Sequence, residues 1–313
     1  MYYFPATAGF HSSTANLFFT LMGLNTRRGT IVAAFGRHYD IRLDDGRIVT
    51  GFPKGKKSPY ACGDRVEVEP DADGRGQIVR HVPRTTLLYR SDQYRQKLIA
   101  ANATQLIFVV ATEPGFSDEL LSRAIVAAEH EHMNVLIVLN KCDLSSGLAA
   151  ARAMLAPYAA LGYEVIEMSA KSNADALRPR LKGHASVLVG QSGMGKSTLI
   201  NALIPDAMAA TREISTALDS GKHTTTYGRL YRTPEGDAII DCPGVQEFGL
   251  AHLSFGEIEN AFREFRQFLD QCRFRDCHHA AEPGCAIKNG VAQGTVSARR
   301  IELFLRIAAH CRQ

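Results

Sequence analysis

The sequence predicts a multidomain protein with an OB-type β-barrel, a central open α/β domain and a helical C-terminal domain. Three observations predict this fold class. Five short strand-like runs lie between residues 28 and 83, solid apolar runs alternate with helical patterns from about residue 98, and a Cys/His cluster lies between helical segments after residue 253. We therefore divide the chain into a tail (1–24), a barrel (25–88), an α/β domain (89–252) and a C-terminal domain (253–313).

The barrel is predicted from five runs that alternate apolar and polar residues. Asp-Gly or Gly-Asp turns break the pattern between them, as expected for short antiparallel strands. A basic loop, PKGKKSP, separates the third run from the fourth. Five short strands in this length suggest a small Greek-key barrel of the OB type, and an SH3-like barrel is the alternative. The runs are GTIVAAF, YDIRL, RIVTGF, DRVEVE and QIVRHV.

The central domain is predicted from apolar runs without alternation, which are typical of strands buried on both faces. Helical patterns lie between some of them, at residues 117–132, 145–161 and 196–203. Alternating strands and helices favour an open, mostly parallel sheet. The runs are QLIFVVA, NVLIVL, YEVIEM, SVLVG and DAIID.

The C-terminal domain is predicted to be helical. In SFGEIENAFREFRQFL, the residues Ile258, Phe262, Phe265 and Leu269 recur at helical spacing. The Cys/His cluster follows, and the segment SARRIELFLRIAAH predicts a final helix.

The composition favours a cytoplasmic protein. No apolar run approaches the roughly 20 residues of a membrane span. The apolar segment ANLFFTLMGL has no Lys or Arg before it, since the first is Arg27, so a secretory signal fits poorly. The seven Cys are an odd number, and three of them fall within residues 272–285, which favours a metal site over a disulfide framework.

Positive charge is concentrated toward both ends of the chain. Residues 25–95 carry 14 Lys+Arg against 9 Asp+Glu, and residues 262–313 carry 9 against 5. Because the whole chain has a net charge of +4, the middle is acidic. Basic ends suit a polyanionic partner such as RNA, and ordinary solvated charged faces are the alternative explanation.

A phosphate-binding loop is predicted where GQSGMGKS follows a strand-like run and opens a helix. Its glycines let the backbone N–H groups turn toward the phosphates, and the helix N-terminus favours anions. We expect Lys196 to reach the β- and γ-phosphates and Ser197 to ligate Mg²⁺. The predicted nucleotide-binding residues of this loop are Gly190, Gln191, Ser192, Gly193, Met194, Gly195, Lys196, Ser197 and Thr198.

Three further motifs end strand-like runs and predict a guanine nucleotide. In DCPG, Asp241 is placed to hold Mg²⁺ through water and Gly244 to face the γ-phosphate. In NKCD, the carboxylate of Asp143 can accept hydrogen bonds from guanine N1–H and its amino group, which selects GTP over ATP. In SAK, the backbone can contact guanine O6. These motifs meet at the carboxyl edge of one sheet, and the predicted guanine-binding residues are Asn140, Lys141, Cys142, Asp143, Ser169 and Ala170.

The segment SGKHTTTYGRL is predicted to be a switch. We expect Thr225 to complete the Mg²⁺ shell, with Thr224 as the second choice. Many GTPases place a Gln after the Gly of Asp-x-x-Gly to orient water, but this chain has Val245 there, with Gln246 one residue later. We therefore predict that His223 positions the attacking water, with Lys196 and Thr225 as the other catalytic residues. A contact of His223 with RNA or solvent is the alternative, and slow hydrolysis accelerated by a partner is expected.

A structural Zn²⁺ site is predicted from Cys-x₄-Cys-x-His-x₅-Cys. Three Cys and one His make a closed tetrahedral set without a catalytic position. His278 is the spare residue, an iron–sulfur cluster is disfavoured by the His ligand, and a metal-free cluster of reduced Cys is the remaining alternative. Arg273, Phe274 and Arg275 between the ligands can present charge and a ring to RNA. The predicted ligands are Cys272, Cys277, His279 and Cys285.

These motifs together make the chain resemble the bacterial family of small-subunit ribosome biogenesis GTPase A (RsgA, also called YjeQ). The resemblance covers nearly the whole chain: an OB domain, a circularly permuted P-loop GTPase domain and a helical zinc-binding domain. It implies binding to the small ribosomal subunit during late maturation, with GTP hydrolysis stimulated by the subunit and coupled to release. It also implies a hydrophobic residue at the usual Gln position, which Val245 satisfies, and a catalytic His in the switch, which His223 matches.

Two positions depart from patterns seen in related proteins. No basic cluster precedes Arg27 and Arg28, which puts an RNA contact by the tail in doubt. Gly193 stands where potassium-activated GTPases carry an Asn ligand, so we predict no requirement for K⁺.

We predict a monomeric, cytoplasmic GTP hydrolase that acts on the small ribosomal subunit with GTP, Mg²⁺ and one Zn²⁺, and that uses its OB and zinc domains to hold ribosomal RNA. Two other classes remain: a GTP-gated RNA-binding module with negligible hydrolysis, and a metabolic or transport NTPase unrelated to RNA.

The order of the nucleotide motifs predicts a mechanical link. NKCD precedes GQSGMGKS, the reverse of most GTPases, and residues 171–185 join the two parts. Close surface termini can be joined and new ends opened elsewhere. In this order the chain after DCPG runs directly into the C-terminal domain, which suggests that the permutation ties γ-phosphate sensing to both RNA-binding modules.

Overall fold

The computed structural model describes residues 26–55, 60–91, 96–204, 207, 228–242 and 248–311. The tail and the predicted functional residues His223, Thr224, Thr225, Gly244, Val245 and Gln246 lie outside the described residues. Among the described helices, none is long and apolar enough to cross a membrane.

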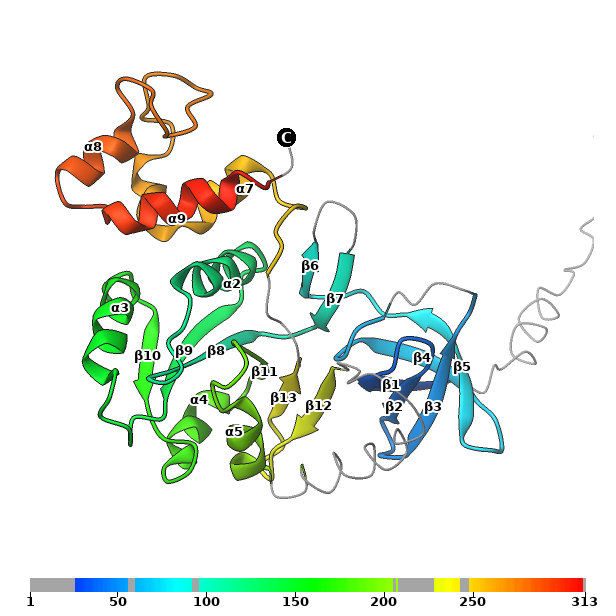
Figure 1. Cartoon of the computed structure of the whole chain (residues 1–313). Helices are drawn as coiled ribbons and strands as arrows, with labels where there is room; N and C mark the ends of the chain where they lie inside the picture. Colours follow the sequence, from blue (N-terminus) through cyan, green and yellow to red (C-terminus); the bar gives the residue numbers. More distant parts are fainter. Residues whose placement is uncertain are drawn as a thin grey trace, which may run out of the picture.

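The first five strands form the predicted barrel (Figure 1). They pair in the order β1-β2-β3-β5-β4, and β1 also pairs with β4, which closes the barrel. Strands β3 and β5 run parallel, and alternate side chains such as Ile31, Ile41, Val66 and Ile78 fill the interior. The strands are β1 (Arg27–Ala34), β2 (Tyr39–Leu43), β3 (Ile48–Pro53), β4 (Arg65–Pro70) and β5 (Arg75–His81).

The predicted apolar runs form a parallel sheet in the order β10-β9-β8-β11-β13. All seven residues of β8 are buried, which explains their lack of alternation. The strands are β8 (Gln105–Ala111), β9 (Asn134–Asn140), β10 (Glu164–Glu167), β11 (Ala185–Val189) and β13 (Ala238–Asp241), and the helices are α2 (Asp118–His130), α3 (Leu148–Ala160), η1 (Ala174–Leu177), α4 (Arg178–Leu181) and α5 (Lys196–Leu203).

Three strands were not predicted, and they join the barrel to the central domain. β6 (Leu87–Ser91) and β7 (Gln96–Ala101) form an antiparallel pair, so the predicted boundary at residue 88 falls inside β6. β12 (Arg229–Arg232) pairs antiparallel with β13, and its Arg229 lies opposite Ala33 of β1. The N–H of Ala34 also donates to the carbonyl of Gly228, at 3.3 Å. The barrel and the α/β domain therefore share one 11-stranded sheet.

A tight turn before β4 allows the barrel to pack closely against the central domain. A Cβ on Gly63, whose φ is +94°, would lie 2.1 Å from the carbonyl oxygen of Ala101, so only glycine allows this approach. The neighbouring Asp64 is fully buried and accepts hydrogen bonds from Arg84 and the backbone of Ala61. Burial raises the pKa of this carboxyl, but these hydrogen bonds outweigh it and hold the pKa below its usual value.

The C-terminal domain is helical, but its first segment is broken. The helical spacing over residues 254–269 predicts helix here, and the structure divides this segment into two helices. Helix α7 (Phe255–Ala261) ends where Phe262 adopts an extended conformation, and a 3₁₀ helix, η2 (Arg263–Phe268), follows. The break lets the rings of Phe262 and Phe265 stack on each other and pack edge-on against Phe304. Two helices complete the domain: α8 (Ala286–Ala292) and α9 (Ala298–Ala308).

The C-terminal domain packs against helix α2 through α7 and α9 (Figure 1). Asp118 at its start binds Arg299 of α9 at 2.8 Å, and the buried carboxylate of Glu129 near its end binds both Arg263 and Arg266. These arginines contribute to the basic C-terminal end noted in the sequence. Their charges are therefore paired with carboxylates inside the fold and are not directed toward a polyanion.

A buried polar network lies in the same interface. Arg300 of α9 is 3% exposed and donates to Glu264 at 2.6 Å and to Ser122 of α2 at 2.9 Å. Its guanidinium also lies over the rings of Phe262 and Tyr158. A buried ion pair of this kind fixes one relative placement of two elements, because moving either leaves a charge unpaired.

Candidate functional site

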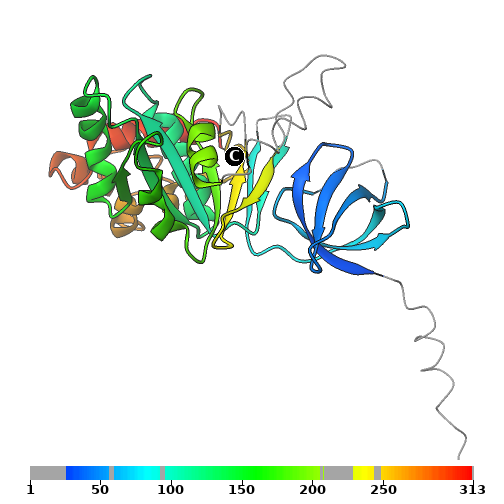
Figure 2. The same ribbon diagram turned by 90° about the horizontal axis from the view of Figure 1, so that it is seen from below.

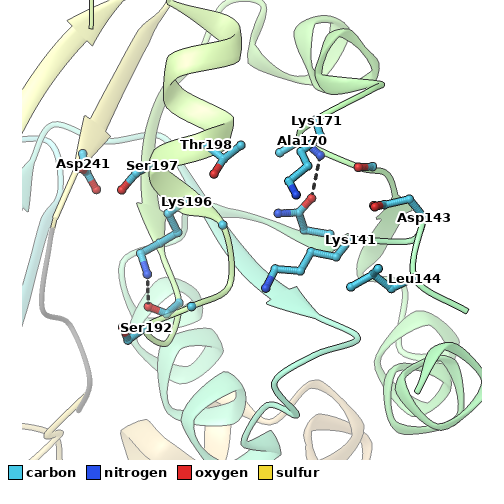
Figure 3. Close-up of a pocket in the computed structure, with 15 residues that line it drawn as sticks. Lys141, Asp143, Leu144, Ala170, Lys171, Ser192, Lys196, Ser197, Thr198 and Asp241 are labelled. Atoms are coloured by element: carbon cyan, nitrogen blue, oxygen red, sulfur yellow. Dashed lines mark hydrogen bonds between the residues drawn. The ribbon is translucent and has the colours of Figure 1, made fainter. Parts of the chain in front are cut away.

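A cavity of about 590 Å³ lies at the carboxyl edge of the parallel sheet (Figure 3). Its volume is in the range of small-molecule sites. Strands β9, β10, β11 and β13 all end beside it. The predicted motifs therefore line one cavity, although NKCD precedes the phosphate loop in the chain. Its lining residues are Asn140, Lys141, Asp143, Leu144, Ser169, Ala170, Lys171, Gly190, Ser192, Gly193, Gly195, Lys196, Ser197, Thr198 and Asp241.

The phosphate loop connects β11 to α5 in a conformation that requires glycine. Gly190, Gly193 and Gly195 have φ of +143°, +80° and +88°. A Cβ on Gly190 would lie 2.3 Å from the carbonyl oxygen of Val109, and one on Gly195 would lie 2.4 Å from the amide nitrogen of Asn140. The loop therefore packs directly against the neighbouring strands, at the start of α5, where backbone N–H groups favour an anion.

Lys196 is held across this loop. Its ammonium donates to the carbonyl of Gly190 at 2.6 Å and to that of Gln191 at 2.7 Å. Burial lowers the pKa of Lys196, and the nearby carboxylate of Asp241 partly opposes this shift. The ammonium is thus partly desolvated, which strengthens its attraction for a phosphate oxygen.

Asn140 ties three loops together. Its side chain is 1% exposed, donates to the carbonyl of Met194 at 2.8 Å and accepts from the backbone N–H of Ala170 at 2.8 Å. The Asn of NKCD thus connects the phosphate loop with the SAK loop. This role fixes the shape of the cavity without requiring a ligand.

Asp143 lies exposed at the other end of the cavity from Asp241 (Figure 3). A hydrogen bond from Ser169 is the main reason why the pKa of Asp143 lies below its usual value. The carboxylate is therefore ionised at neutral pH and can accept two hydrogen bonds from one edge of a base. Guanine offers two adjacent donors of this kind, whereas adenine does not.

Asp241 and Ser197 lie together at the phosphate end of the cavity (Figure 3). Burial raises the pKa of Asp241 to about 6, although Lys196 opposes the shift. A desolvated carboxylate beside a hydroxyl supplies the oxygen ligands that Mg²⁺ prefers. The donor set therefore fits Mg²⁺.

Three predicted residues belong to the loops without lining the cavity. The side chain of Gln191 accepts from the N–H of Ser117, which is the N-cap of α2, and thereby fixes the phosphate loop to that helix. The thiol of Cys142 donates to the carbonyl of Leu139, and Met194 is 1% exposed in the core. Any contact of these three with a nucleotide would be through the backbone.

Two lining residues, Leu144 and Lys171, were not among the predicted site residues. Leu144 directly follows NKCD, and Lys171 is the last residue of the SAK motif. Extending NKCD by one residue and including the whole of SAK would have found them.

The predicted metal ligands converge in the C-terminal domain. The three sulfurs and His279 Nδ1 all lie within 4.8 Å of one another. Cys272 Sγ lies 3.9 Å from Cys285 Sγ and 3.6 Å from His279 Nδ1. Two sulfurs bound 2.3 Å from one tetrahedral ion would be about 3.8 Å apart, so the spacing fits Zn²⁺.

Glu259 orients the histidine of this cluster. Its carboxylate lies 2.7 Å from His279 Nε2, which leaves Nδ1 facing the sulfurs. A carboxylate on the outer nitrogen is the usual support for a metal-binding His. His278, by contrast, is exposed and lies 4.0 Å from Glu282.

Comparison with known proteins identifies the family. The model of the RsgA GTPase family matches residues 81–251. A curated relative from Burkholderia pseudomallei (strain K96243), named small ribosomal subunit biogenesis GTPase RsgA, is 52% identical over 91% of this chain and 93% of its own length. A relative of the same name from Paraburkholderia phytofirmans is 54% identical over 91% and 93%. The chain belongs to the RsgA GTPase family.

Solved structures agree with the RsgA assignment. The crystal structure of YjeQ from Thermotoga maritima has a TM-score of 0.69 at 28% identity and covers 91% of this chain and 98% of that one. The structure of YloQ, described as a circularly permuted GTPase, has a TM-score of 0.66 over 91% and 94% of the two chains; at 24% identity it supports the fold alone. The predicted family and the three-part fold are thus confirmed.

Replacing Asp143 by Asn is expected to change which base this RsgA-family protein binds. The Asn amide would turn a donor toward the guanine donors, and loss of two charge-assisted hydrogen bonds should weaken GTP binding by on the order of 100-fold or more. Xanthosine triphosphate has a carbonyl in place of the guanine amino group and should bind the variant better than GTP does. Titration with fluorescent analogues of both nucleotides measures this.

Asp175→Asn is the matched control, because Asp175 is an exposed carboxylate outside the cavity. It should bind GTP as the unmodified protein does. Unchanged GTP affinity in Asp143→Asn would mean that the base lies elsewhere.

Proposed function

We propose that this protein binds the small ribosomal subunit and assists its late maturation, hydrolysing GTP in a reaction that the subunit stimulates and that is coupled to release. The observation that carries the nucleotide part is the single cavity that joins the phosphate loop, Asp241 and the NKCD loop. The ribosomal part rests on the names of relatives at 52% and 54% identity. Such a factor is expected to act as a monomer in the cytoplasm.

In this proposal, the nucleotide lies across the cavity, with its phosphates bound at one end and its guanine base at the other. The backbone of the phosphate loop and Lys196 hold the β- and γ-phosphates, while Asp143, with the backbone of Ser169 and Ala170, holds the guanine. Ser197 and Asp241 would hold Mg²⁺ together with Thr225, and the ion supplies charge neutralisation at the phosphates when bound. Gly244 would face the γ-phosphate.

The water-positioning group is proposed to be His223. Its support is the sequence alone: Val245 replaces the Gln that usually orients water and cannot form a hydrogen bond through its side chain. His223→Ala should therefore reduce turnover with little change in GTP affinity.

The C-terminal cluster is proposed to hold one structural Zn²⁺ through Cys272, Cys277, His279 and Cys285. We propose that this domain and the barrel contact ribosomal RNA. Support comes from the excess of basic over acidic residues in the barrel and the segment directly after it: residues 25–95 contain 14 Lys+Arg and 9 Asp+Glu.

Phosphate release from GTP, measured alone and with purified small or large subunits, tests the proposal. Turnover should rise with small subunits only. Equal rates in all three samples would contradict it.

Two rival functions give different results in the same system. A GTP-gated RNA-binding module would co-sediment with small subunits but show no multiple turnover. A metabolic or transport NTPase would turn over GTP without co-sedimentation in the presence of a non-hydrolysable analogue.

We also propose that nucleotide state is coupled to the C-terminal domain through residues 249–254. Here Gly249 and Ala251 exchange backbone hydrogen bonds with Ser91 of β6, and the Ser91 hydroxyl lies 2.8 Å from His252 Nδ1. Flexible residues inserted in this segment should uncouple subunit-stimulated hydrolysis from GDP-triggered release. If both stay unchanged, coupling does not use this path.

A further inference from the structure

A second cavity, of about 540 Å³, lies at the edge of the parallel sheet opposite the nucleotide cavity. β9 connects the two cavities, because Asn134 at its start lines the second and Asn140 at its end lines the first. Arg263 of η2 also lines the second cavity, which therefore lies where the α/β domain meets the C-terminal domain, a common position for small-molecule sites. We call the space bounded by Gln105, Asn134, Glu164, Arg180, Lys182 and Arg263 the amino-edge cavity.

Positive charge exceeds negative charge around the amino-edge cavity. Arg180 of α4 forms an ion pair with Glu164 at the start of β10, at 2.9 Å, so these two charges balance. Lys182, directly after α4, is exposed, and no carboxylate in the described part of the chain pairs with it. The carboxylate of Asp237 is next to this loop, but it accepts from the backbone N–H of Gly183. Lys182 therefore contributes an uncompensated positive charge.

Arg263 contributes to a second excess charge. Its Nε binds Glu129 at 2.7 Å, and the same carboxylate binds Arg266 at 2.8 Å, so two guanidinium groups share one negative charge. The Nη1 of Arg263 reaches only the carbonyl of Gly162, at 3.5 Å. Donor capacity of Arg263 thus remains for a further acceptor. Together with Lys182, the cavity has two positive charges that no carboxylate balances among the residues that the structure describes.

A buried acceptor faces the same cavity. Gln105, at the start of β8, is 5% exposed, and its Nε2 donates to the carbonyl of Arg180 and to the Ser186 hydroxyl, both at 3.0 Å. These bonds fix the orientation of the amide, because its oxygen could not face a carbonyl. Within the described residues, Gln105 Oε1 receives no hydrogen bond, and it is not among the fully buried atoms that lack a partner. It therefore keeps access to the cavity and can accept from a ligand hydroxyl.

The two excess charges and the free acceptor suit one class of ligand. A phosphate monoester carries a charge of about −1.5 to −2 at pH 7 and three acceptor oxygens, which matches Lys182 and Arg263 together. A phosphodiester or a carboxylate carries a single negative charge and would leave one of these cations unbalanced. A hydroxyl on the same molecule would satisfy Gln105. The volume of the cavity is in the range of sites for small molecules.

We propose that the amino-edge cavity binds a small hydroxylated phosphate monoester, such as a sugar phosphate. Its phosphate contacts Lys182 and Arg263, and a hydroxyl donates to Gln105. Arg180 also reaches the phosphate, in competition with its ion pair to Glu164. Because Arg263 belongs to the C-terminal domain and Lys182 to the α/β domain, the ligand contacts both domains. This site goes beyond the proposed function, since neither the nucleotide nor the ribosomal partner occupies it.

The test titrates ribose 5-phosphate into the full chain while saturating GDP and Mg²⁺ keep the probe out of the nucleotide cavity. His184 is the reporter, because it lines the amino-edge cavity with Nδ1 3.1 Å from Thr104 Oγ1. Its ring resonances, identified by their absence in His184→Gln, should shift in a saturable way. Methyl phosphate lacks the hydroxyl and should bind about 5-fold more weakly, the effect of one hydrogen bond. Ribose without phosphate should not bind.

Two variants change the affinity in opposite directions. Lys182→Gln should weaken binding of ribose 5-phosphate by roughly 10- to 100-fold, since it removes a charge-assisted hydrogen bond. Glu164→Gln frees Arg180 and removes a competing carboxylate, so it should tighten binding by about 5-fold. Arg232→Gln is the matched control: Arg232 is exposed, donates to the carbonyl of Gly236 and lines neither cavity. It should bind the probe as the unmodified protein does.

Absence of a saturable shift of the His184 resonances, or unchanged affinity in Lys182→Gln, would overturn the proposal. Tighter Lys182-dependent binding of an RNA trinucleotide without terminal phosphates would also overturn it, by assigning the cavity to an RNA backbone. Unchanged GTP affinity in each variant shows that the fold is intact. The titration contains no ribosomal subunits, so its failure leaves the proposed function standing. Failure of subunits to stimulate hydrolysis leaves the amino-edge site standing.

Discussion

Replacing Cys285 by Ser is expected to unfold the C-terminal domain while the nucleotide cavity stays intact. Cys285 is 2% exposed, lies within the four-ligand cluster and is the N-cap of α8. A structural zinc site contributes about 10–16 kcal/mol, which is comparable to the whole stability of a domain. For the proposed Zn²⁺ site, zinc content, far-UV circular dichroism and limited proteolysis should all report the loss, whereas GTP affinity should change little.

Cys311→Ser is the matched control, because Cys311 is partly buried but outside the cluster. It should keep both the metal and the fold. A graded effect is expected for Glu259→Gln, which weakens support of His279 and should lower metal affinity by about 10- to 100-fold without unfolding the domain. A Cys285→Ser protein with unchanged proteolytic resistance would show that packing around Phe304 suffices to hold this domain.

Asp241→Asn is expected to affect stability and function in opposite directions. In the nucleotide-free protein, the raised pKa of about 6 means that ionised Asp241 is costly to the folded state. Removing the charge should raise the free energy of unfolding by up to about 3 kcal/mol at pH 8. The same substitution removes an anionic Mg²⁺ ligand and should reduce GTP hydrolysis by on the order of 100-fold or more.

The raised pKa of Asp241 determines how the stability difference between the two proteins depends on pH. An unfolded Asp titrates near 3.8 and the folded one near 6, so the unmodified protein loses stability as pH rises through this interval. The stability gain of the variant should therefore be near zero at pH 4 and reach its full size above pH 7. Urea unfolding without nucleotide or Mg²⁺ at both pH values measures it. A variant that is less stable at pH 8 would mean that the Asp241 carboxylate has a favourable partner in the folded state.

The fold was predictable wherever local pattern and burial agree. β8 coincides with its predicted run because all seven residues are buried and no alternation competes with the apolar signal. β12 has only four residues, and β6 and β7 lack a clean alternation, so their pairing depends on neighbours distant in sequence. The break after α7 was not predictable from helical spacing, because Phe262 and Phe265 keep that spacing while packing against Phe304.

The site was predictable to the level of motifs. Asn140, Asp143, Lys196 and Asp241 were found because each motif ends a strand, and parallel strands end at the same edge. Side-chain direction was not predictable from the motif: Gln191 turns to the N-cap of α2, and Met194 turns into the core.

The sequence by itself determined the motifs that carry the proposed chemistry: a phosphate-loop motif, an NKCD motif and a Cys₃His cluster, each specified by residues close together in the chain. Only the tertiary structure decided how these parts are joined. The pairing of β1 with β12 and the ion pairs of Asp118 and Glu129 involve residues far apart in sequence. Such contacts form only when several elements are already in place, because a single long-range pair does not repay the entropy of closing the chain around it.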